Sequence, residues 1–256
     1  MLPHSGHDYT LLIRRWKAVA ERAGVELRLL NETGGYPVFV VENEQAAARE
    51  PGGIYLSAGV HGDECAPVWA LLQWMESDPE ILRRLPVVIF PCINPSGFVE
   101  NTRRDHEGID LNRCFENNAH HVIGSWQTFM EGRQFDLALN LHEDYDAGGI
   151  YLYELAREDS KGNELLSACE KIIPRETAST VDGSDFNNGL LTRSGDLERL
   201  VEEELGGGYP EAILLFLRYS RNSYTFETPS EFDLIRRIEA HQAFLEAATK
   251  PLMESA

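Results

Sequence analysis

The 256-residue sequence has little cysteine and no long apolar run. Its four cysteines are scattered without C-x-x-C spacing, so neither a cysteine zinc site nor a disulfide framework is predicted, and free thiols are expected. The longest apolar run, AILLFL at 212–217, is far shorter than the roughly 18 residues of a membrane helix. The first residues also lack the apolar core of a secretory signal. We therefore expect a soluble, cytoplasmic protein that starts at Met1 and has no membrane partner.

Positive charge is also scarce. The chain has 23 Lys and Arg against 42 Asp and Glu, which gives a formal net charge of −19. Because so acidic a surface repels phosphate backbones, no nucleic-acid partner is expected, and an anionic substrate would need local positive charge. Hydrophobic residues at 43% and charged residues at 25% are ordinary globular values. The length fits one domain, which we expect to span 1–256.

Extended and helical segments alternate along the chain. Helical spacing or composition predicts helices at 8–24, 66–77, 164–173, 196–205 and 231–250. Short apolar runs predict strands at 25–30, 36–42, 54–60, 86–94, 135–141, 150–155, 212–217 and 223–229. This alternation predicts an α/β fold, with a mixed and mostly parallel central β-sheet flanked by helices on both faces.

Residues that can hold a metal follow several of the predicted strands. His61 and Glu64 lie three apart after 54–60, and His142 directly follows 135–141. Taken singly, each has an ordinary explanation as a surface pair or a structural histidine. However, ligand sites in open α/β sheets lie beyond the carboxyl ends of the strands, where all three are expected. Two imidazoles and one carboxylate form a standard catalytic zinc set with a fourth position open to water.

The order of several short motifs resembles that of the carboxypeptidase A type zinc metallopeptidase family. The family's sequence of HxxE, NPDG, Thr-Arg, DLNRNF, a strand-end His and a late Glu appears here between residues 61 and 227 as HGDE (61–64), NPSG (94–97), TR (102–103), DLNRCF (110–115), His142 and Glu227. The resemblance implies a zinc carboxypeptidase-like domain with one Zn²⁺ per chain, held by His61, Glu64 and His142.

The resemblance also implies roles in catalysis. Glu227 matches the general base, which takes a proton from the metal-bound water and passes it to the leaving amine; partial burial at a strand end would raise its pKa. Arg103 matches the arginine that stabilises the oxyanion, a role suited to a permanently charged fork of donors. Asp110 matches the carboxylate that orients the ring of the first zinc histidine.

A substrate-binding group is implied as well. Asn112 and Arg113 match the pair that grips the terminal carboxylate of the substrate, where an arginine can bond both oxygens. The family has a mobile tyrosine ahead of the late Glu, for which Tyr209 is the nearest match, although Tyr219 and Tyr224 compete with it.

Two departures from the family pattern lie beside the expected site. Cys114 replaces the usual Asn after DLNR, and Glu143 and Asp144 follow His142 where small or aromatic residues are usual. This acidic pair could recruit a second divalent ion or favour basic substrates, against the simpler reading that it is structural or faces solvent. Only six residues separate Arg103 from Asp110, which indicates a trimmed substrate cleft.

Three functions are open at this point. HGDECAP is similar to the opening motif of a sister group, aspartoacylase and succinylglutamate desuccinylase, which cleaves N-acyl amino acids. NPSGF followed by Thr-Arg favours the peptidases, including compact bacterial ones that act on cell-wall peptides. We therefore predict a zinc-dependent hydrolase of an amide (peptide) bond, a carboxypeptidase or peptide amidase, with an N-acyl amino acid deacylase as the main alternative. The third possibility is a non-catalytic binding domain on the same scaffold.

Overall fold

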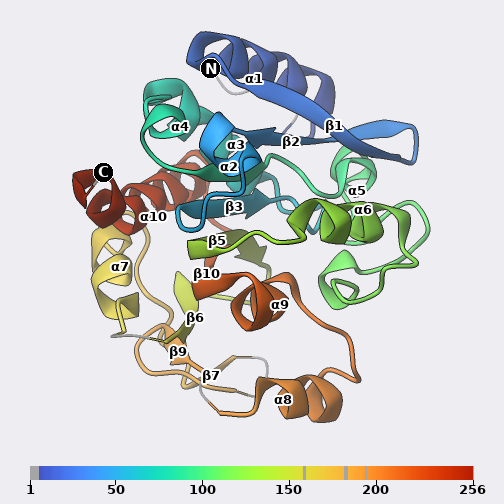
Figure 1. The fold of residues 1–256 in the computed structure, drawn as a ribbon. Coiled ribbons are helices and arrows are strands. Elements are labelled where there is room, and N and C mark those ends of the chain that lie inside the picture. Colours follow the sequence, from blue (N-terminus) through green and yellow to red (C-terminus); the bar gives the residue numbers. More distant parts are fainter. Residues whose placement is uncertain (1–5, 158–159, 182–183, 194, 256) are drawn as a thin grey trace.

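An eight-stranded mixed sheet forms the centre of the computed structural model, which describes residues 6–157, 160–181, 184–193 and 195–255. The strand order is β1, β2, β4, β3, β5, β10, β6, β9, and in Figure 1 the strands labelled β3, β5, β10, β6 and β9 follow one another from top to bottom. β4, β3, β5 and β10 are parallel in succession, as are β6 and β9, whereas β1–β2, β2–β4 and β10–β6 are antiparallel. The strand bounds are β1 Glu26–Thr33, β2 Tyr36–Glu42, β3 Ile54–Ala58, β4 Val87–Phe90, β5 Phe135–Asp144, β6 Tyr151–Ala156, β9 Leu190–Thr192 and β10 Ser220–Pro229. A separate two-stranded ladder joins β7 (Thr180–Val181) and β8 (Ser184–Asp185).

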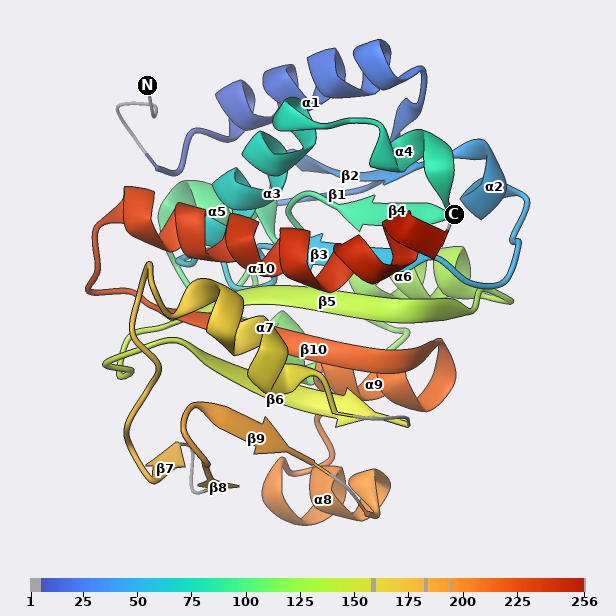
Figure 2. The ribbon, with the colours of Figure 1, turned by 90° about the vertical axis from the view of Figure 1, so that its left-hand side faces the viewer.

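Helices cover both faces of the sheet (Figures 1 and 2). One face carries α1 (Tyr9–Ala23), α3 (Cys65–Ser77), α7 (Gly162–Cys169) and α10 (Leu234–Ser255). The other carries α6 (His121–Met130) and α9 (Glu211–Arg218), with α8 (Leu197–Glu204) beyond β9. Short helices occupy the connections: α2 (Glu44–Ala47), α4 (Ile81–Arg84), α5 (Pro95–Glu100) and the 3₁₀ turn Leu111–Arg113. The predicted α/β class with a helix layer on each face is confirmed.

The two helix layers are held by two apolar clusters, one on each face of the sheet. Successive side chains of a strand point to opposite faces, so Ile54 and Leu56 of β3 join the cluster under α1, α3 and α10, whereas Tyr55 joins the cluster under α6 and α9. Because both faces are covered, β3 is buried at every position. This double burial explains why the central strands are short and almost wholly apolar.

Most predicted elements are confirmed, and one strand is wrong. Residues 212–217 lie in the helix α9, which begins after Pro210 and buries Ile213, Leu214 and Leu215 against the sheet. A short apolar run does not by itself distinguish a strand from a buried helix, and Pro210 with Glu211 in the first turn was the overlooked helix signal. The NPSG segment begins the helix α5 with Asn94 as its N-cap.

The turn after β3 is brought against α5 by a close approach of two backbones. A Cβ on Gly62 would lie 2.0 Å from the carbonyl carbon of Gly97, so only glycine fits there. The HGDE and NPSG motifs therefore lie side by side at the carboxyl end of the parallel strands, the edge at which β5 and β10 also end. Among the described residues, no helix combines the length and apolar character needed to span a bilayer.

Candidate active site

Three predicted metal ligands converge at the carboxyl end of the sheet. One ligand atom from each of His61, Glu64 and His142, here called the metal triad, lies within 4.8 Å of the other two, and all three side chains are buried. Nδ1 of His61 lies 2.5 Å from one Glu64 oxygen, and Nδ1 of His142 lies 2.9 Å from the other. The structure thus brings the two imidazoles to the same carboxylate from separate elements.

Each member of the metal triad is fixed by its backbone. His61 lies three residues beyond β3, and Glu64 is the residue before the first turn of α3. His142 belongs to β5, whose neighbour β10 places Glu227 directly beside it in the parallel register. Because three different elements supply these side chains, the geometry depends on the sheet as a whole.

The triad fits a bound cation. Burial opposes protonation of His61, but the carboxylates of Glu64 and Asp110 together outweigh it and raise the pKa of His61 to about 9. Both oxygens of the buried Glu64 carboxylate face an imidazole nitrogen. A buried carboxylate is costly without a compensating positive charge, and a dication between these ligands supplies it. Two imidazoles and a carboxylate suit zinc in particular.

A carboxylate lies behind the first histidine of the triad. Asp110 Oδ1 is 3.3 Å from Nε2 of His61, and its Oδ2 accepts a 3.1 Å bond from Nε of Arg103. A carboxylate at Nε2 keeps the proton on that nitrogen and leaves the lone pair of Nδ1 for a metal. Arg103 is half-exposed, with Nη1 3.3 Å from Nδ1 of His61. Both residues therefore lie where the sequence placed them, next to the metal triad.

Glu227 is buried at the floor of the same site. One of its oxygens has no hydrogen-bond partner among the described residues. Burial raises the pKa of Glu227 to about 8, and the nearby carboxylates of Glu64 and Asp144 add to the shift, while His142 acts in the opposite direction. A raised pKa and an unpaired oxygen suit a group that accepts and returns a proton.

Asn112 and Arg113 line the cavity that contains the triad. Asn112 is oriented by Glu211, a residue that the sequence analysis did not single out. The backbone N–H of Glu211 donates a 2.9 Å bond to Oδ1 of Asn112, which leaves the side-chain Nδ2 to donate to a ligand. Glu211 itself is buried, and its carboxylate accepts a 2.5 Å bond from the hydroxyl of Tyr55. Glu211 is the first residue of the helix α9, whose residues 212–217 were predicted as a strand. This role of Glu211 therefore did not emerge from the sequence.

The cavity that contains these groups has a volume of about 640 Å³. Its lining includes the metal triad, Arg103, Asn112, Arg113 and Glu227, together with Tyr145, Tyr151, Tyr153, Arg193 and Glu204, which the sequence did not single out. Arg193 and Glu204 pair at 3.7 Å on its wall. The predicted substrate-binding residues other than Tyr209 thus share one cavity with the predicted metal ligands.

Tyr209 is not among the residues that line this cavity. Its carbonyl accepts a hydrogen bond from the N–H of Phe115, and its side chain joins the apolar cluster under α6 and α9. The competing residue Tyr219 packs edge-on against Trp126 on the same side of the sheet. Tyr151 lies beside Glu227 in the antiparallel register of β6 and β10, so it is better placed than Tyr209 in this conformation.

The acidic residues after His142 have protein partners. Glu143 is buried and pairs with Arg237 of α10, and its second oxygen accepts a 2.9 Å bond from the N–H of Ala66 at the start of α3. Asp144 accepts a 2.7 Å bond from the hydroxyl of Tyr151. Cys114 donates a 3.3 Å bond from Sγ to the carbonyl of Asp110. These contacts support the simpler structural reading of Glu143 and Asp144, and we do not propose a second ion there.

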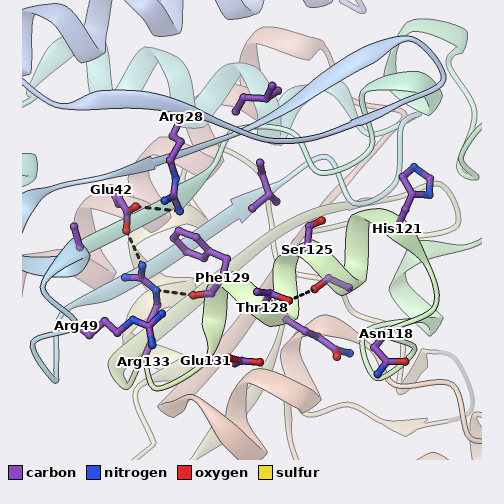
Figure 3. A pocket seen from close by; sticks show the side chains of 15 residues that line it. Arg28, Glu42, Arg49, Asn118, His121, Ser125, Thr128, Phe129, Glu131 and Arg133 are labelled. Carbon is purple, nitrogen blue, oxygen red and sulfur yellow. Dashed lines mark hydrogen bonds and ion pairs between the residues drawn. The ribbon is translucent and has the colours of Figure 1, made fainter.

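A larger hollow of about 940 Å³ lies elsewhere, between β1, the α2 loop and α6 (Figure 3). Its most prominent cation, Arg133, lies over the ring of Phe129 at 4.1 Å and donates to the carbonyls of Phe129 and Ala46 and to Glu42. Arg28 also pairs with Glu42, at 3.2 Å. These groups hold α6 to the sheet, and the candidate active site lies at the metal triad instead.

Parts of the chain are similar in sequence to known proteins. Residues 52–170 match the model of the succinylglutamate desuccinylase/aspartoacylase catalytic domain. A 70-residue stretch is 41% identical to murein peptide amidase A of Escherichia coli (strain K12) and covers 27% of the length of each protein. The chain therefore spans about a quarter of the curated relative it matches.

The fold is shared with solved structures over nearly the whole chain. A candidate metallopeptidase from Shewanella amazonensis SB2B superposes with a TM-score of 0.81 and 21% identity, covering 96% of this chain and 94% of its own. A metallo-carboxypeptidase from Burkholderia cenocepacia superposes with a TM-score of 0.67 and 15% identity, covering 97% of this chain and 70% of its own. These superpositions confirm the predicted carboxypeptidase-like fold.

Proposed function

We propose that the protein is a zinc-dependent hydrolase that cleaves an amide bond, with the metal triad as the zinc site. The observation that carries the proposal is the convergence of two imidazoles and two carboxylates in one buried cluster, with Glu227 directly beside His142 in the sheet. A bound zinc ion would acidify a water molecule and polarise the scissile carbonyl.

Glu227 and Arg103 have separate roles in the proposed reaction, proton transfer and stabilisation of negative charge. Glu227 takes a proton from the attacking water and returns it to the leaving nitrogen, a task that its raised pKa favours. Arg103 donates hydrogen bonds to the carbonyl oxygen as that oxygen gains negative charge. Because Arg103 is half-exposed, it can turn toward the substrate while Asp110 stays against His61.

The substrate that suits the cavity carries a free carboxylate. Arg113 and the Nδ2 group of Asn112 provide donors at the cavity wall, and they supply local positive charge in an acidic protein. A carboxypeptidase or a compact peptide amidase uses such a pair to hold the terminal carboxylate of a peptide. The stretch shared with murein peptide amidase A supports a cell-wall peptide as one member of this class.

An N-acyl amino acid deacylase is the second candidate. It is supported by the match of residues 52–170 to the succinylglutamate desuccinylase/aspartoacylase catalytic domain. The chemistry is the same in both cases, and the substrate carboxylate occupies the same donors. The two candidates differ in whether a peptide or a short acyl group lies on the other side of the scissile bond.

A matched substrate panel tests the proposal. Zinc-loaded protein is assayed with peptides bearing a free C-terminal acid, the same peptides as C-terminal amides, muropeptides and N-acyl amino acids. We expect hydrolysis within one of the acid-bearing classes, its loss on amidation and its loss with a chelator. Cleavage of N-acyl amino acids alone would select the deacylase, whereas no hydrolysis of any substrate by zinc-saturated protein would favour a non-catalytic binding domain.

A further inference from the structure

A second group of metal-binding side chains lies outside the active site. Glu107, His120 and His121, here called the surface triad, each place one ligand atom within 4.8 Å of the other two. His120 is the N-cap of α6 and is buried, whereas Glu107 and His121 are exposed. The three residues come from two segments, the turn at 105–109 and the start of α6.

A buried carboxylate prepares His120 to bind a metal. Asp105 is 5% exposed, and its Oδ2 lies 3.0 Å from Nε2 of His120. A carboxylate at Nε2 keeps the proton on that nitrogen, so the lone pair is on Nδ1. That lone pair accepts only a 3.4 Å bond from the N–H of Ile123, which is longer than the usual range of about 2.7–3.2 Å. The arrangement matches that of His61 with Asp110 behind it.

The turn that carries Glu107 is rigidly built. Oδ1 of Asp105 accepts the backbone N–H groups of Glu107 at 3.0 Å and of Ile109 at 2.8 Å. The same aspartate therefore shapes the turn and orients His120, so Glu107 is held against the start of α6. His121 follows His120 and is exposed at one end of the hollow in Figure 3. Its ring stacks on that of His120, with centroids 4.9 Å apart.

From this geometry we propose that the surface triad is a second metal site, which binds a transition-metal dication such as zinc. Imidazole nitrogens with one carboxylate oxygen suit zinc, copper or nickel better than magnesium or calcium. The ion joins the turn at 105–109 to the first turn of α6. Because Arg103 and Asp110 flank this turn in the sequence, the ion braces the segment that lines the active site from outside. The proposal does not depend on the function proposed above.

Zinc itself is the probe for the test. Each protein is equilibrated with a slight excess of zinc chloride, freed of unbound metal, and analysed for ions per chain. We expect two ions in the unaltered protein, and one in Glu107→Gln, in His121→Gln and in His142→Ala. The double variant His142→Ala/His121→Gln should hold none. Glu107 and His121 are exposed, so replacing them should leave the fold intact, and thermal unfolding checks this.

His106→Gln is the matched control. The ring of His106 lies 6.1 Å from that of His121, on the same surface but outside the surface triad. This variant should keep two ions. An ion count that is the same in Glu107→Gln and His121→Gln as in the unaltered protein would overturn the proposal, because the zinc would then be held elsewhere. Loss of the second ion in His106→Gln would also contradict the assignment of the three ligands.

Discussion

The metal triad and the surface triad have the same composition, two histidines and one glutamate, in very different surroundings. Each has a histidine whose Nε2 faces an aspartate, Asp110 in one case and Asp105 in the other. In the metal triad all three ligands are buried at the end of a parallel sheet, whereas two ligands of the surface triad are exposed. The same ligand set therefore occurs in a closed and in an open environment.

The two triads also differ in the groups that surround them. The metal triad opens into a cavity that also contains Glu227, Arg103 and Arg113. Low local polarity strengthens the electrostatic effect of each of these groups on a reacting carbonyl. The surface triad instead lies on a turn and a helix start, where we propose that its ion braces the chain.

The first prediction tests whether the two triads differ in role by removing one histidine from each. We expect His142→Ala to lose the ion of the metal triad and to reduce hydrolysis to the background rate, because only two protein ligands, His61 and Glu64, remain. His121→Ala should hydrolyse the best substrate at the normal rate. Steady-state assays with metal analysis of the same samples measure both, and equal losses in the two variants would contradict the division of roles.

The second prediction compares the buried Glu227 with the exposed Glu107. Glu227→Gln should keep the zinc ion and reduce kcat by about 10²–10⁴-fold, since the amide cannot accept the proton of water. Glu107→Gln should leave kcat unchanged. Normal turnover by Glu227→Gln would show that another group is the base.

Two adjacent arginines provide a third, smaller contrast. Arg103→Ala should reduce kcat by about 10²–10³-fold, the usual effect of removing one donor to a developing oxyanion. Arg104 instead donates a 2.9 Å bond to the carbonyl of Gly108 within the turn. Arg104→Ala should therefore change kcat little, and a loss equal to that of Arg103→Ala would point to a general effect of charge on the cavity.

The smallest predicted effects come from the two aspartates. In Asp110→Asn, the new amide would donate to Nε2 of His61 and move the proton to Nδ1, which weakens zinc binding at the metal triad by about 10–100-fold. Asp105→Asn should have the same effect at the surface triad only. Zinc titration monitored by a competing chelator, in backgrounds that lack the other triad, separates the two. Cross effects between the triads would contradict their independence.

The metal triad could be predicted from the sequence because its members belong to motifs that occur in a fixed order. His61 and Glu64 follow β3 and His142 lies near the carboxyl end of β5, two strands whose apolar runs are easily recognised, and parallel strands bring such residues together. Asp110 and Arg103 were found through the DLNR and Thr-Arg motifs. The orienting role of Glu211 was not, because it depends on a helix whose apolar run was read as a strand.

The surface triad could not be predicted from the sequence. The helix α6 was not predicted, although Val122, Trp126 and Phe129 recur at helical spacing. Even with that helix, the link from Glu107 to His120 depends on the turn that Asp105 builds, which is a matter of packing rather than of spacing. Tyr151 likewise reaches Glu227 only through the antiparallel pairing of β6 with β10.

The most direct test of the account is a zinc titration of the metal-free His121→Gln protein, with hydrolysis of its best substrate as the readout. This variant retains the metal triad alone. We predict no hydrolysis without zinc, a linear rise with added zinc and full activity at one ion per chain. Hydrolysis at the full rate by the metal-free protein, or none at one ion per chain, would contradict the proposed zinc-dependent mechanism.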